Sequence, residues 1–480
     1  MTSGGQQSTE RLRDYLRALK PQARAMLIAE LERGLLRGEE VAGNDLVLQE
    51  LRRAMRAAGQ PPGLRVGDAA RLFFAPLEPF LTDDAADHKR IGRLARVSLD
   101  PIWEWIGRDL MPAEAKALTE DIDRALSADD RTKAEQLTGA LQERAAQRIR
   151  GAIAAVEGNE KARRRLAVQV GTPRSLDDLG AVARVLAIRD VLSDLARRLP
   201  DRMRAFEHEH ADAVKALLEG ATSPRSPEGA ARKVDVFLYG LILIMGRLEA
   251  PWQLIRIASR AAESDDTARV SETPFAVAVT IVLSEIECMV RELRRHLKEH
   301  HRVNTLLKNL HDAARGLRTE LDLSVDSPWS RQLAAIRTEI SNLLKTELES
   351  APGRVRRLLR PRPAKEIVPG SLLDTIDVGD AEMVVELVGA CRHYASELAI
   401  NEATMRSYAE LRQYLETGTN VLLDTLRQAG DGDRPFRQSQ VEAAVRFCRT
   451  MFGSDYAGLL AKAAEIAVQA GSADRKTVRA

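Results

Sequence analysis

Residues 296–300, His-Leu-Lys-Glu-His, have the spacing of a zinc-binding helix. On a continuous helix, His296 and His300 lie one turn apart on the same face, where two imidazoles can chelate Zn²⁺. Glu299 between them is then placed to activate a metal-bound water. The pattern therefore raises the hypothesis of a metal-dependent hydrolase with His296 and His300 as metal ligands.

Several features of the sequence count against an enzyme. Peptidases with this motif also need an α+β fold and a third acidic ligand, and the sequence indicates neither. It contains no glycine-rich phosphate loop, no G-x-S-x-G and no recognisable Cys/His nucleophile pair. The three cysteines, Cys288, Cys391 and Cys448, lie far apart without C-x-x-C spacing, which favours small core residues in a reducing cytoplasm. We therefore favour a non-enzymatic protein without a cofactor.

The two histidines also belong to a longer pattern, an apolar repeat with alternating gaps of four and three over residues 274–323. Such a repeat predicts one long coiled-coil helix, beginning at Thr273 and Pro274. Its first half is the candidate interaction seam: Phe275, Val279, Val282, Ile286, Met289, Leu293, His296 and His300. The histidines form a polar layer, which in a dimer brings four imidazoles together for metal binding or pH sensing. The alternative is that the bundle opens here and both rings are partly solvated.

A second, shorter helix follows the repeat. Ser327 and Pro328 form a cap and first-position pair, and 4-3 spacing continues from Trp329 to Leu343. The short link between the two segments predicts a hairpin over residues 274–349. Because the second arm is about half as long, much of the seam needs another partner, either a core helix such as 231–248 or a second copy of the chain.

The strongest charge run is an arginine-rich strip after this hairpin. Five arginines, Arg354, Arg356, Arg357, Arg360 and Arg362, lie within nine residues. A basic, proline-bounded strip can bind nucleic-acid phosphates or anionic lipid through charge attraction. Aromatic residues for base stacking are missing from it. The alternatives are a solvated linker, or a strip that docks on the more acidic C-terminal region.

Composition places the chain among all-α globular proteins. It has 480 residues, 44% apolar and only 4% aromatic, and alanine, leucine, arginine and glutamate favour helix. Lys and Arg total 72 against 70 Asp and Glu, so global charge predicts no polyanionic partner. The longest apolar run, residues 236–245, is half of the roughly 20 residues that a membrane span needs. We expect no signal peptide, no transmembrane segment and a cytoplasmic location.

The sequence predicts a multi-helix bundle with a long coiled-coil helix hairpin and a smaller C-terminal helical domain. The expected boundaries are a disordered start (1–8), an N-terminal helical region (9–58), a central helical bundle (68–350) that includes hairpin 274–349, a basic Pro/Arg linker (351–371), a C-terminal helical domain (372–470) and a disordered tail (471–480).

Our leading functional hypothesis is a cytoplasmic scaffold or adaptor that self-associates or binds a partner helix through the seam. The second is a protein that binds nucleic acid or an anionic membrane surface through the arginines. The third is the metal-dependent hydrolase.

Overall fold

The computed structural model of the protein describes residues 69–82, 90–128, 130–221, 227–297 and 300–478, together with part of residues 12–51. Nearly all of the described chain is helical, which confirms the predicted all-α multi-helix bundle. Two short parallel strands, β1 (Leu81–Thr82) and β2 (Leu94–Ala95), are the exception. The predicted disordered start, residues 1–8, lies outside the described residues.

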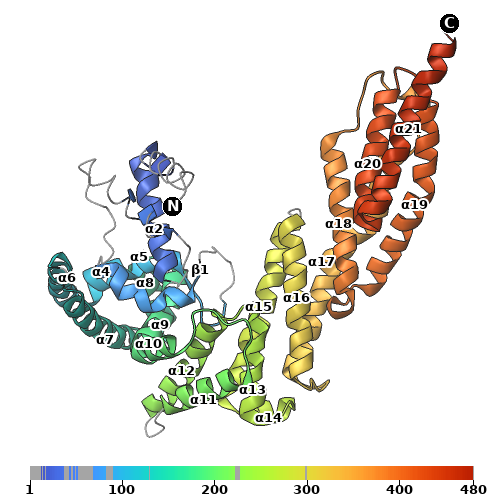
Figure 1. Ribbon diagram of the computed structural model, residues 1–480. Helices are drawn as coiled ribbons and strands as arrows, with labels where there is room; N and C mark the ends of the chain where they lie inside the picture. Colours follow the sequence, from blue (N-terminus) through green and yellow to red (C-terminus); the bar gives the residue numbers. More distant parts are fainter. Residues whose placement is uncertain are drawn as a thin grey trace, which may run out of the picture. The chain divides into compact units, whose positions relative to one another are not determined.

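The chain divides into two compact units. The first comprises Met1–Ala262 and Glu272–Ile281, and the second Glu263–Ser271 and Val282–Ala480. The helical elements of the first unit (Figure 1) are α2 (Pro21–Leu36), α4 (Ala69–Phe74), η1 (Ala75–Phe80), η2 (Arg96–Ser98), α5 (Leu99–Trp105), η3 (Ile106–Leu110), α6 (Pro112–Ser127), α7 (Arg131–Ala155), α8 (Glu160–Val170), α9 (Pro173–Ala187), α10 (Arg189–Arg198), α11 (His208–Gly220), α12 (Pro227–Met245), η4 (Pro251–Leu254), α13 (Ile255–Ala262) and η5 (Pro274–Ala276).

Helix α9 forms the centre of the first unit. It packs against α7, α8, α12 and β2, and Thr172 caps its first turn by accepting a hydrogen bond from the Ser175 N–H. Asp178 on this helix is buried and accepts hydrogen bonds from the Ala95 N–H (3.1 Å) and the Ser98 hydroxyl (2.8 Å). A buried carboxylate needs such donors, so this residue fixes the strand segment onto α9.

Helix α12 contains the apolar run at 236–245, and most of that run is buried. Tyr239 packs edge-to-face on Phe80, with ring centroids 5.2 Å apart. Burial raises the pKa of Tyr239 to about 12, although the nearby Arg184 charge opposes the shift. The run is therefore part of the core of the first unit, as its composition predicted.

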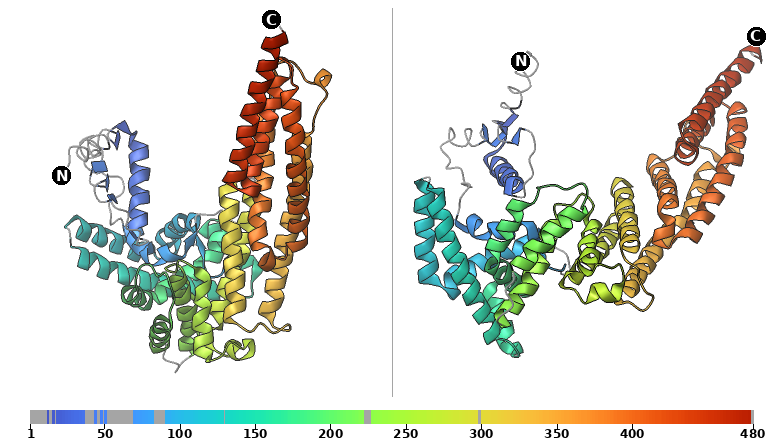
Figure 2. Two further views of the ribbon diagram at one scale, coloured as in Figure 1. Left: turned by 45° about the vertical axis from the view of Figure 1, so that its right-hand side comes forward. Right: turned by 60° about the horizontal axis from the view of Figure 1, so that its bottom comes forward.

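The second unit consists of α14 (Thr267–Ser271), most of α15 (Val277–His296), α16 (His300–Glu320), α17 (Pro328–Leu359), η6 (Ala364–Glu366), α18 (Thr375–Leu398), α19 (Asn401–Arg427), α20 (Arg434–Phe452) and α21 (Ser454–Val478). Figures 1 and 2 show α15 and α16 as a hairpin and α18 to α21 as a bundle of long helices. Helix α21 continues to Val478, past the start of the predicted tail at 471.

One continuous helix over 274–323 was predicted, and that continuity is wrong. Helix α15 ends at His296, the chain turns at Leu297, and α16 begins at His300. Both histidines occupy core positions of the repeat, so no apolar side chain there holds a straight helix against a core. Helix α17 then runs parallel to α15, because Gln332 and Glu339 contact Glu287 and Arg294 respectively, each at 2.7 Å.

The predicted linker at 351–371 also begins too early. Helix α17 passes through Pro352 and ends at Leu359, so the first nine residues of that linker belong to this helix. A proline inside a helix costs a hydrogen bond. Here Pro352, Val355 and Leu358 are buried on one face of α17, which packs on α18, α19 and α20. Burial of that apolar face outweighs the local cost of the proline.

Candidate basic surface site

The arginine-rich strip forms a cavity at the C-terminal end of α17. The cavity has a volume of about 670 Å³ and is lined by Gly353, Arg356, Arg357, Arg360, Arg362 and Glu366. We call it the arginine cavity. Four of the five arginines that the sequence indicated therefore surround one space. Their charges also lie near the last turn of α17, where a helix dipole favours cations.

Two side chains of α20 fix the path of the strip. Gln440 is fully buried and donates to the carbonyls of Leu358 (2.9 Å) and Arg360 (3.1 Å). Arg437 donates to the carbonyl of Arg362 at 3.3 Å. Carbonyls at a helix C-terminus lack intrahelical donors, so these bonds satisfy groups that would otherwise need water. The strip is consequently a positioned segment of the C-terminal bundle.

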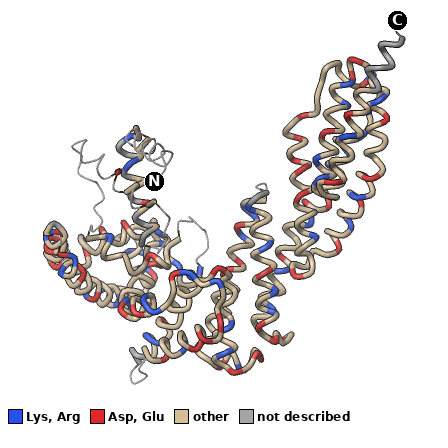
Figure 3. The backbone as a smooth tube through the Cα atoms, viewed as in Figure 1, with Lys and Arg blue, Asp and Glu red and all other residues tan. Residues whose placement is uncertain are grey.

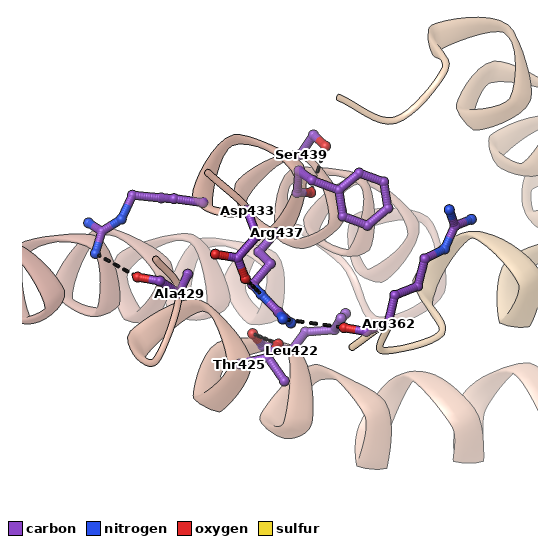
Figure 4. A network of polar contacts seen from close by, with 9 residues as sticks. Arg362, Leu422, Thr425, Ala429, Asp433, Arg437 and Ser439 are labelled. Carbon is purple, nitrogen blue, oxygen red and sulfur yellow. Dashed lines mark hydrogen bonds and ion pairs between the residues drawn. The ribbon is translucent and has the colours of Figure 1, made fainter. Parts of the chain in front are cut away.

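Arg437 is held in turn by Asp433, one helical turn earlier. Figure 4 shows its guanidinium between the Asp433 carboxylate and the backbone of Arg362. Both side chains of the ion pair are buried. Burial raises the pKa of Asp433, but the hydrogen bond and charge of Arg437 outweigh burial, so that this pKa lies below its ordinary value. The carboxylate is therefore ionised at neutral pH and orients Arg437.

Two arginines of the cavity have partners within the chain. Arg356 forms an ion pair with Glu410 at 3.0 Å, and its guanidinium lies 5.9 Å from the centre of the Tyr414 ring. The guanidinium of Arg362 lies 5.1 Å from the centre of the Phe436 ring. Stacking on an aromatic ring leaves the N–H groups at the guanidinium edge available to an acceptor. These contacts position both cations without occupying all of their donors.

Arg357 and Arg360 differ from the other two. Both are exposed, and their guanidinium groups form no hydrogen bond or ion pair with any described residue. Two unpaired guanidiniums close together repel each other, and an anion between them relieves that repulsion. A phosphate or carboxylate group in the cavity can accept bidentate hydrogen bonds from either arginine.

The fifth arginine, Arg354, lies outside the arginine cavity. It pairs with Glu347 at 2.9 Å and lines a second cavity, of about 720 Å³, next to the turn at Leu297. Asp377 and Asp380 line that cavity together with arginines, so its charge is mixed. The second cavity is therefore a poorer site for an anion than the arginine cavity.

Most of the predicted interaction seam is buried in the protein. Its buried members each have at most 2% of their surface exposed: Phe275, Val279, Val282, Ile286 and Leu293. Met289 and His296 are half-buried. Phe275 packs edge-to-face on Phe237 of α12, with centroids 4.8 Å apart. Burial of this kind stabilises the fold, and a partner helix that used the seam would have to displace contacts already made within the chain.

The histidines do not share a helix face. His296 ends α15 and His300 begins α16, so the i, i+4 geometry that a zinc-binding helix requires is not formed. The His296 ring lies against the Arg302 guanidinium, with its two nitrogens 3.2 and 3.3 Å from one Arg302 nitrogen. The side chain of His300 and all of Glu299 lie outside the described residues. Among the residues that are described, no group of three or more His, Cys, Asp and Glu could hold a metal ion.

The three cysteines are buried and form no disulfide bond. Burial raises the pKa of both the Cys391 and the Cys448 thiols to about 12. A thiol with such a pKa is protonated at neutral pH, whereas nucleophilic cysteines need a lowered value. Cys391 and Cys448 therefore serve as small core residues.

Elsewhere in the described residues, the charges are not segregated. Figure 3 shows basic and acidic residues mixed along the helices of each unit. Within the described ranges, no helix combines the length and the apolar character that crossing a membrane would require. Comparison with protein-family models, with curated proteins and with solved structures found no match to this chain.

Sequence reasoning found the arginines but missed the residues that position them. The Asp433–Arg437 spacing of i, i+4 is a recognisable ion-pair signal on a helix. Gln440, Glu410 and Tyr414 carry no such signal, because they meet the strip only through packing of α19 and α20 on α17.

Proposed function

We propose that this protein is a non-enzymatic helical scaffold or adaptor that binds an anionic partner surface through the arginine cavity. One observation carries the proposal: four arginines surround one cavity, and two of them have guanidinium groups without a partner among the described residues. Clusters of this kind recognise phosphate or other anionic groups. Burial keeps the thiols of Cys391 and Cys448 protonated, which does not suit a nucleophile.

Binding of a partner helix through the seam stays part of the scaffold hypothesis, but burial of the seam supports the arginine cavity as the more accessible surface. Cysteines without disulfide bonds are typical of a reducing compartment, and we therefore propose a cytoplasmic location.

The test is retention of the full chain on immobilised heparin across a salt gradient. The double variant R357A/R360A removes the two unpartnered guanidiniums. We expect it to elute at lower salt, with the slope of log K against log salt reduced by about two, since each charge contact contributes roughly one.

The matched control is R202A/R204A. It removes the same charge from two exposed arginines of the first unit, whose ion pairs with Glu249 are at the surface. Wild-type protein that passes heparin at low salt, or equal effects of the two double variants, would show that the arginine cavity does not bind anions.

A further inference from the structure

A tight turn follows the arginine cavity. The Ser371 N–H donates to the Val368 carbonyl at 3.0 Å, which closes a four-residue turn with Pro369 and Gly370 at its centre. Gly370 has a φ of +77°, as the third position of a type II turn requires. Proline before glycine is the sequence preference of that turn type, so the local sequence itself specifies the geometry.

The turn is anchored to the bundle on both sides. The Gly370 N–H donates to the Gly432 carbonyl at 2.9 Å, and the Leu373 N–H donates to the Ser439 hydroxyl at 3.0 Å. Ile367 and Leu373 are buried, with 7% and 8% of their surfaces exposed. Figure 2 shows the connector between α17 and α18, residues 360–374, looping out at the end of the helices. Its outward side chains are thus presented from a fixed backbone.

Two large aliphatic side chains on this anchored turn face solvent. Val368 is 70% exposed and Leu372 is 66% exposed. A β-turn brings its first and fourth residues, here Val368 and Ser371, within about 7 Å, and Leu372 directly follows Ser371. Glu366, which lines the arginine cavity, is only two residues before Val368. Exposed aliphatic and unpaired cationic groups therefore lie within one short segment of the chain, residues 357–372.

We propose that the arginine cavity and this turn together dock on a lipid bilayer that contains anionic phospholipids. The proposal rests on the proposed function and names its partner. Headgroup phosphates bind Arg357 and Arg360, while Val368 and Leu372 enter the boundary between headgroups and acyl chains. Peripheral attachment of this kind combines charge attraction with burial of apolar side chains.

The aliphatic pair is what favours a bilayer over nucleic acid. Single-stranded nucleic acids bind through stacking of bases on aromatic rings, and duplexes through phosphate contacts and base edges. Exposed valine and leucine add little to either mode. At a bilayer, the same side chains leave water, which is favourable.

The experiment compares full-length protein on vesicles of phosphatidylcholine alone and of phosphatidylcholine with 30% phosphatidylserine. The variants are V368S/L372S, R357A/R360A and the control L459S, which replaces an equally exposed leucine (69%) on α21. We expect binding only to the anionic vesicles. V368S/L372S should weaken it by about tenfold and leave heparin retention unchanged. R357A/R360A should weaken both vesicle binding and heparin retention, and L459S should change neither of them.

The outcomes separate the two proposals. Retention on heparin without binding to anionic vesicles, or vesicle binding that V368S/L372S does not change, overturns the bilayer proposal and leaves a polyanion as partner. If wild-type protein neither is retained on heparin nor binds anionic vesicles, the proposed function is overturned as well. Circular dichroism melting checks that the variants fold.

The variant L372W places a tryptophan next to the turn. On anionic vesicles, its fluorescence emission should shift to shorter wavelength relative to that of wild type. The absence of a shift would contradict insertion of the turn.

Discussion

At the level of single residues, the basic surface depends on polar groups that are themselves buried. Gln440 and Arg437 donate to backbone carbonyls between Leu358 and Arg362, and Asp433 holds Arg437. Without these donors, the carbonyls at the end of α17 would need water, and the strip would leave the bundle. The exposed arginines are therefore placed by three residues that a ligand need never touch.

Replacement of Asp433 by asparagine should destabilise the second unit, because it leaves the Arg437 charge buried without its counterion. We expect a loss of about 3 kcal/mol in the free energy of unfolding at pH 7, measured by urea denaturation. Asp424→Asn breaks an exposed pair with Arg427 and should cost less than about 0.5 kcal/mol.

The difference in stability between wild type and the Asp433→Asn variant should also depend on pH. The pKa of this carboxyl is lower in the folded protein than its ordinary value of 3.8, so its stabilisation is complete above that value and is lost as the pH falls through the lower, folded pKa. Urea midpoints of the two proteins should therefore converge below pH 3.8. A gap that stays constant down to strongly acidic pH would show that the ionised carboxylate is not the stabilising species.

At the level of elements, two helices of the C-terminal bundle are each followed by a residue with positive φ, and these two residues differ in type. Ala399 follows α18 with φ of 55° and ψ of 34°, in the left-handed region. Gly453 follows α20 with a φ of +91°. Only glycine adopts positive φ without strain from Cβ, so Gly453 suits its position and Ala399 does not.

Exchanges at these two positions should have opposite effects. Ala399→Gly is expected to raise the free energy of unfolding by about 0.5–1 kcal/mol, and Gly453→Ala, at a φ of 91° and a ψ of 175° that essentially only glycine adopts, to lower it by about 1–3 kcal/mol. Both positions are exposed, and a Cβ on Gly453 would meet no atom within 4 Å, so backbone strain is the main difference. Thermal melts that shift in the same direction for both variants would contradict this assignment.

At the level of the whole molecule, the apolar repeat of residues 274–323 serves to build the chain's own core. Its buried positions continue from α15 into α16, where Val303, Leu307 and Leu310 are at most 3% exposed. We therefore expect the seam to stabilise the monomer fold.

Ile286→Glu tests this role. It places a carboxylate where 1% of the side chain is exposed, and it should cost on the order of 4 kcal/mol, a large part of the stability of a typical domain. We expect lost helix content and a lower melting temperature by circular dichroism. Val325→Glu, at an 86% exposed position, is the control. If the variant instead kept its melting temperature and light scattering showed a smaller particle than wild type, the seam would join two chains.

Local sequence was sufficient to predict those features that depend only on residues close together along the chain. Helix-forming composition predicted an all-α protein, the Ser327–Pro328 pair predicted the start of α17, and the arginines at 354–362 predicted a basic surface. The apolar character of residues 236–245 predicted a core helix. Each of these follows from propensity, capping or hydrophobicity, which act over one or two helical turns.

Only the tertiary structure decided where the chain turns and which charges meet. A 4-3 repeat does not reveal that α15 ends at His296, because the same spacing suits one long helix or two shorter ones packed on a core. Pro352 signals a helix end, yet burial of its face carries α17 to Leu359. Gln440 lies 80 residues from Arg360 along the chain, and packing of α20 on α17 brings them together. Long-range burial selects among locally equivalent conformations, and so it determined the arginine cavity.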